Sequence, residues 1–186
     1  MAEMIAGVIH RQAACILIDP YANAFQGDAS KPSPHHKDDT DMRPGVFERK
    51  WELDSLCYCI RLSYEYWKDT GDTATFDQDW WRAMHLAVAT MRDQQREKNH
   101  GLYHFTRGRV KPGDLGYGPP MKPTGMICEA FRESDDPTVY LFNIPANLFA
   151  VTSLEQLARM TDAMKPGDHF SAECRNRAAE VKQGIQ

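Results

Sequence analysis

The 186-residue sequence lacks the features of several protein classes. Its longest apolar stretches, such as "AACILI" ending at Ile18, are far too short to span a bilayer. It has no dense basic patch and its net charge is -4, so a nucleic-acid partner is not expected. The N-terminus lacks the charged and then apolar pattern of a signal peptide. We therefore expect a soluble chain with no membrane partner, and the cytoplasm is the favoured location.

Paired cysteine motifs are also missing. The five cysteines (Cys15, Cys57, Cys59, Cys128 and Cys174) form no CxxC pair, which argues against a zinc knuckle and against a disulfide framework. Free cysteine is among the most buried residue types. We predict reduced and mostly buried thiols, in keeping with a reducing compartment.

Apolar residues recur with a period near 3.6 in five stretches, and all the periodic stretches are helical. The predicted helices cover residues 2–19, 51–68, 76–98, a stretch that begins at Pro145, and 169–183. Pro20 stops the first helix, Gly71 can take the left-handed conformation that ends the second, and Pro145 is tolerated at a first helical position. The pattern predicts an all-α protein.

Two long irregular segments, 20–50 and 99–125, separate these helices, and the second is rich in glycine and proline. Such loops are uncommon in compact domains unless they have a function. Both carry histidine, aspartate, arginine and aromatic residues. This layout is typical of a helical scaffold that presents a site at one end.

The stretch "VFERKWELDSLCY", residues 46–58, combines carboxylates, arginine and aromatic rings at a helix entrance. Carbohydrate sites use this mixture, because hydroxyl groups bind to carboxylates and arginine while C–H faces stack on rings. Glu48, Arg49, Glu52 and Asp54 are the candidates. In the alternative interpretation, the carboxylates favour the positive end of the helix dipole and Trp51 packs in the core.

The stretch "HHKDDTD" contains His35, His36 and aspartates at positions 38, 39 and 41. Histidine and aspartate can bind metal ions. The spacing is irregular and prolines flank the stretch, so we predict a surface loop and no metal site.

The stretch "FRESDDPTVY" carries adjacent carboxylates at Asp135 and Asp136. One of them can brace the turn before Pro137 while the other faces a ligand. Glycosidases need a carboxylic acid that protonates the leaving oxygen and a second carboxylate on the other side of the sugar. From the residues alone, a turn and a catalytic acid are both open.

Several stretches together resemble glycoside hydrolase family 125, the metal-independent exo-α-1,6-mannosidases. They occur in the family's order and cover most of residues 1–160. The stretches are "RQAACILIDPYANAF" (11–25), "VFERKWELDSLCY" (46–58), "YHFTR" (103–107), "GYGPPMKPTGM" (116–126), "FRESDD" (131–136) and "IPANLFAV" (144–151).

The resemblance implies an (α/α)6 barrel that removes a terminal, non-reducing α-1,6-linked mannose from an oligosaccharide, with inversion and without a cofactor. It also implies that Asp135 or Asp136 is the general acid. The residues implied for the wall of the sugar pocket are Tyr21, Asn23, Glu48, Arg49, Glu52, Asp54 and Arg107.

The sequence departs from the family in length. Family members carry an Arg-Asp-Ser motif upstream and the catalytic base glutamate downstream, so we expect residues 1–186 to be a partial barrel domain without its N-terminal and C-terminal portions and without the base. Residues Cys59, Cys128, Glu133 and Pro137 also differ from the family pattern. A non-catalytic, mannose-binding remnant is therefore the main alternative, and a metal-dependent module is a third.

An open barrel has a physical consequence. About five helices do not close a twelve-helix barrel, so apolar faces are expected to stay exposed. We predict that the chain associates with itself or with a complementing chain through those faces.

Overall fold

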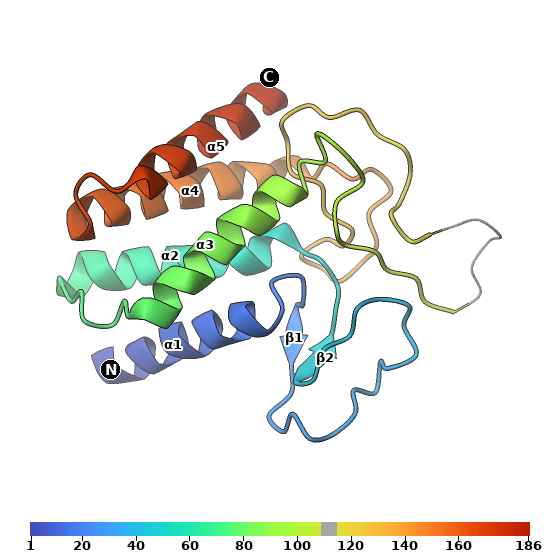
Figure 1. Ribbon diagram of the computed structural model, residues 1–186, viewed down its shortest axis with the longest axis horizontal. Helices are drawn as coiled ribbons and strands as arrows, with labels where there is room; N and C mark the ends of the chain where they lie inside the picture. The colour runs from blue at the N-terminus through green and yellow to red at the C-terminus, as the bar shows by residue number, and fades with distance from the viewer. Residues whose placement is uncertain (109–114) are drawn as a thin grey trace.

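The computed structural model describes residues 1–108 and 115–186, and five long helices dominate it. Successive helices run in opposite directions, so the long loops gather at one end (Figure 1). The predicted all-α architecture is confirmed. The helices are α1 (Ala2–Ile18), α2 (Leu53–Thr70), α3 (Gln78–Asp93), α4 (Ile144–Met164) and α5 (His169–Ile185).

Local signals set most of the helix ends. Gly71 has a φ of 68° and ends α2, as the sequence predicts. Asp77 caps α3 by accepting a hydrogen bond from the Trp80 amide, and Asp168 caps α5 in the same way through the Phe170 amide. These contacts satisfy amide groups that have no partner within the helix.

The predicted end of the third helix, at Lys98, is wrong, because α3 ends at Asp93. The carbonyl of Gln94 accepts a hydrogen bond from the Cys128 amide at 2.8 Å instead of continuing the helix. Arg96 then adopts a left-handed conformation with a φ of 54°. A contact with a segment distant in the sequence therefore ends the helix, and the local pattern carries no sign of it.

The helices share one core. The α4 helix packs against α5 and α2, and α1 packs against α3 and α2. The side chains of Trp51, Trp80 and Leu154 are almost completely buried. The Trp80 indole donates a hydrogen bond to Ser63 Oγ at 3.0 Å, so its one polar atom is satisfied in the interior. No helix in the described ranges 1–108 and 115–186 combines the length and apolarity needed to cross a membrane.

The predicted loop 20–50 is not wholly irregular. It contains the short strand β1 (Ala24–Phe25), and β2 (Val46–Glu48) pairs with it in antiparallel orientation, with Ala24 opposite Glu48. Side chains alternate along β2, so Glu48 is buried while Phe47 is partly exposed. The prediction of a loop over 99–125 falls partly on 109–114, which lie outside the described residues.

The cysteines are free, and Cys57, Cys128 and Cys174 are buried. The burial of these three agrees with the prediction of mostly buried thiols. One face formed by α2 and α4 carries exposed apolar side chains, among them Tyr58, which is 54% exposed, and Leu148, which is 50% exposed. The Tyr58 ring contacts Phe149 edge-on, which links the two helices across this face.

The first prediction tests which side of α4 holds the fold together. Leu154 is fully buried, whereas Leu148, on the same helix, is half-exposed. We expect Leu154→Ala to lower the free energy of unfolding by about 2 to 5 kcal/mol, because it leaves a cavity in the core. Urea unfolding of Leu148→Ala provides the matched control, which we expect within about 1 kcal/mol of the wild type. Equal losses in the two variants would contradict the packing.

Candidate active site

A cleft of about 590 Å³ opens at the loop end of the helices. Lys50 lines it together with residues from several stretches between positions 96 and 141, so tertiary structure creates the site. The lining includes three cationic side chains, four aromatic rings and one carboxylate, namely Lys50, Arg96, Arg107, Tyr103, Phe105, Tyr117, Phe131 and Asp135. Charged groups beside ring faces suit a sugar, which offers hydroxyl groups and C–H surfaces together.

Asp135 and Asp136 have different surroundings. Asp135 lines the cleft, and its φ of 68° places it in the left-handed region, which aspartate tolerates better than most residues. Asp136 instead accepts a hydrogen bond from Ser134 Oγ at 2.9 Å, and its carbonyl accepts one from the Arg132 amide. Asp136 thus braces the turn from which Asp135 reaches the cleft.

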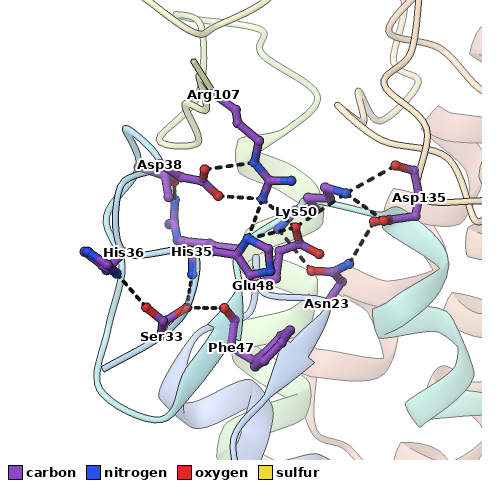
Figure 2. Close-up of polar contacts among 12 residues, drawn as sticks. Asn23, Ser33, His35, His36, Asp38, Phe47, Glu48, Lys50, Arg107 and Asp135 are labelled. Carbon is purple, nitrogen blue, oxygen red and sulfur yellow. Dashed lines mark hydrogen bonds and ion pairs between the residues drawn. The ribbon is translucent and has the colours of Figure 1, made fainter. Parts of the chain in front are cut away.

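The side chains of Lys50 and Asn23 both contact the carboxylate of Asp135 (Figure 2). The Lys50 ammonium lies 2.7 Å from Asp135 Oδ2, and the Asn23 amide donates to Asp135 Oδ1 at 3.4 Å. Asn23 Oδ1 also accepts a hydrogen bond from the Lys50 backbone amide, which joins the two residues. Lys50 is 7% exposed and also lies 3.5 Å from Glu48.

Glu48 belongs to a second group of charges with Arg107 and Asp38. Arg107 forms a fork with Asp38, with Nε 2.8 Å from Oδ1 and Nη2 2.6 Å from Oδ2. The same Nη2 lies 2.5 Å from Glu48 Oε1. Glu48 therefore links this group to Lys50 and, through it, to Asp135.

Arg49 and Tyr21 lie beneath this surface. Arg49 is 2% exposed and donates to Asp19 at 2.7 Å, and its guanidinium lies over the rings of Tyr21 and Tyr103. The Tyr21 hydroxyl donates to Asp93 at 2.8 Å. Neither residue lines the cleft in the described part of the chain. Their contacts support the wall from inside.

Glu52 and Asp54 stand at the start of α2, beside the buried Glu129. Burial, more than the neighbouring charges of Asp54 and Asp135, raises the pKa of Glu52 to about 7. Burial likewise raises the pKa of Glu129 to about 7, and it raises that of Asp54, where Glu133 adds to the effect. Glu129 Oε2 accepts a hydrogen bond from the Leu53 amide at 3.3 Å, so this distant residue caps α2.

Sequence reasoning missed Lys50, Asp38 as a partner of Arg107, and Glu129. Lys50 lies inside "VFERKWELD", but only the acids, the arginine and the rings of that stretch stood out as sugar ligands. Glu129 does have a signal, because it is the single charge within the apolar run "MICEAF". An isolated carboxylate in such a run indicates a buried acid with a specific partner.

Comparisons with known proteins identify the family of the chain. The family described as metal-independent alpha-mannosidase (GH125) matches residues 1–186. The chain belongs to glycoside hydrolase family 125. A Streptococcus pneumoniae family member, solved in a non-productive complex with α-1,6-mannobiose, is 35% identical and superposes with a TM-score of 0.91. Its (α/α)6 barrel gives the fold class of this family 125 chain.

A second relative is longer as well. The meiotically up-regulated gene 157 protein of Schizosaccharomyces pombe is 32% identical over 193 residues, which cover 90% of this chain and 37% of the yeast protein. The alignment with the streptococcal structure covers 99% of this chain and 44% of that one. The chain thus spans less than half the length of each relative.

The second prediction concerns Glu129 and pH. Burial raises the pKa of Glu129 in the folded protein from its ordinary value of 4.5 to about 7. Proton binding by Glu129 therefore contributes its full stabilisation below pH 4.5, and this contribution is lost as the pH rises through about 7. We expect Glu129→Gln, which keeps an acceptor for the Leu53 amide, to be more stable than the wild type at pH 8 by up to about 3 kcal/mol. The difference should shrink toward pH 5 in urea unfolding.

Glu133→Gln is the matched control for this change, because it removes one negative charge from an exposed neighbour. We expect its effect on the free energy of unfolding to stay within about 0.5 kcal/mol at both pH values. A Glu129→Gln variant whose stability follows that of the wild type at every pH would contradict the buried-acid assignment.

Proposed function

We propose that the chain is the acid-bearing part of a glycoside hydrolase that removes terminal, non-reducing α-1,6-linked mannose with inversion and without a metal. Family membership and the similarity to an enzyme solved with α-1,6-mannobiose support this proposal. The observation that carries it is the position of Asp135, the one carboxylate that lines the cleft in the described ranges, among cationic and aromatic side chains.

In this mechanism Asp135 is the general acid. Its proton passes to the glycosidic oxygen as the C1–O bond breaks, while a water molecule attacks C1 from the opposite face and loses a proton to a base. The base glutamate of the family is expected outside these 186 residues. Asp135 must first part from the Lys50 ammonium, which lies 2.7 Å away, so substrate binding has to open that ion pair.

In this assignment Glu48, Glu52, Asp54 and Asn23 remain proposed sugar ligands. Tyr21 and Arg49 act from behind the wall, where they position the segment that carries Glu48 and Lys50. Arg107 lines the cleft, and its guanidinium is bound by Asp38 and Glu48.

The third prediction separates the two aspartates. In any preparation that supplies a base and releases mannose from α-1,6-mannobiose, we expect Asp135→Asn to reduce that release by at least about 100-fold, because the general acid is lost. Asp136→Asn, the matched control on the same turn, should lose far less. NMR of the product should show β-mannose first. The proposed role of Asp135 fails if Asp136→Asn is the variant that abolishes turnover, or if α-mannose appears first.

A mannose-binding remnant without turnover is the alternative, and the ion pair between Asp135 and Lys50 favours it. A carboxylate held by an ammonium is a good hydroxyl ligand but does not donate a proton until the pair opens. Calorimetry with mannose distinguishes the two functions. Binding by a folded chain that releases no product in any preparation would support the remnant.

We also propose that residues 1–186 form part of one (α/α)6 catalytic domain, and the fourth prediction follows. The face with Tyr58 and Leu148 exposes apolar area that a closed barrel covers. We expect the chain to associate in sedimentation experiments as its concentration rises, and Leu148→Lys to weaken the association. A monomer with a sharp unfolding transition that is independent of concentration would count against it.

A further inference from the structure

Three side chains near the cleft converge like the ligands of a metal ion. Atoms of His35, Asp38 and Glu48 that can bind a metal lie within 4.8 Å of one another. His35 and Asp38 come from one turn, in which the Asp38 amide donates to the His35 carbonyl at 3.0 Å, and Glu48 comes from β2. The carboxylates are largely buried, with exposed side-chain fractions of 6% for Asp38 and 11% for Glu48.

A single cationic atom occupies the centre of this group (Figure 2). Arg107 Nη2 lies 2.6 Å from Asp38 Oδ2, 2.5 Å from Glu48 Oε1 and 3.1 Å from His35 Nδ1. A guanidinium has donors only, so His35 Nδ1 must accept and points its lone pair at the site. A metal ion would use that same lone pair.

The site is also fixed from behind. Ser33 accepts a hydrogen bond from the His35 amide at 2.9 Å, and its hydroxyl donates to the Phe47 carbonyl on β2. His36 points away from the site, with Nδ1 2.9 Å from the Ser33 carbonyl (Figure 2). Of the two adjacent histidines, only His35 can therefore act as a ligand.

We infer that the Arg107 guanidinium is a resident cation in a site with metal-ligand geometry, and that removal of Arg107 turns His35, Asp38 and Glu48 into a divalent-metal site. Without Arg107, the cation that the ranges 1–108 and 115–186 leave within ion-pair distance of these carboxylates is Lys50, 3.5 Å from Glu48, and Lys50 is already paired with Asp135. Buried, uncompensated carboxylates attract a replacement cation.

The donor set selects the kind of metal. One imidazole and two carboxylates fit Zn²⁺ with a fourth position left to water. They fall short of the six to eight oxygen ligands of Ca²⁺. Ligand atoms around a tetrahedral Zn²⁺ are roughly 3.4 Å apart, so the three side chains need to close by about an ångström. The inference concerns this cluster alone and does not depend on the proposed mannosidase activity.

The fifth prediction uses calorimetric titration of the purified chain with ZnCl₂. We expect Arg107→Ala to bind one Zn²⁺ at least about 100-fold more tightly than the wild type, because a guanidinium no longer competes for the ligands. In the Arg107→Ala background, His35→Ala should lose at least about 10-fold of that affinity, whereas the matched control His36→Ala should lose almost none. CaCl₂ should give no comparable binding.

Thermal unfolding gives an independent readout. Zn²⁺ at about a hundredfold excess over its Kd should raise the Tm of Arg107→Ala by roughly 5 to 10 °C and leave that of the wild type unchanged. Arg107→Met, which keeps an apolar stem against Phe105, serves if the alanine variant does not fold alone. The inference is wrong if Zn²⁺ binds the variants no better than the wild type, if His35 and His36 prove equivalent, or if Zn²⁺ fails to support folding of both variants.

Discussion

The ion pair between Asp19 and Arg49 is the interaction on which the site depends. Asp19 directly follows α1 and Arg49 directly follows β2, and the two side chains meet at 2.7 Å with almost no exposure. The guanidinium lies over the rings of Tyr21 and Tyr103 and also donates to Thr40 Oγ1 at 2.8 Å. Because a buried charge is costly without its partner, this pair fixes four loop segments relative to the helices.

That anchor determines where the neighbouring side chains lie. Glu48 and Lys50 flank Arg49 in an extended segment, and they contact each other across it at 3.5 Å. Trp51 continues into the core, and its carbonyl accepts hydrogen bonds from the Ala130 and Phe131 amides. The turn that presents Asp135 is thereby held beside Lys50. The residues that line the cleft are thus held in place by the buried ion pair between Asp19 and Arg49.

The helices and the stretches that form the site could be predicted from the sequence, because apolar periodicity and caps are local. The pairing could not. Arg107 meets Glu48 across 59 positions, and Asp135 lies 85 positions from Lys50. No local pattern distinguishes Arg49, which is buried, from Arg107, which reaches the surface, although both were expected in the sugar pocket. The short strand β2 was hidden for a related reason, since three residues are too few for a visible alternation.

The carboxylates beside the cleft and the buried Glu129 at the start of α2 are stabilised by different means. Around Arg107 and Lys50, cations pair with the negative charges of Asp38, Glu48 and Asp135. At the start of α2, no cation among the described residues comes within ion-pair distance of Glu129. Burial raises the pKa of Glu129 to about 7, because its effect outweighs that of the hydrogen bond from the Leu53 amide, which lowers the pKa. A proton replaces the missing cation there. Cations thus compensate the carboxylates beside the cleft, whereas burial leaves Glu129 at the start of α2 with a raised pKa.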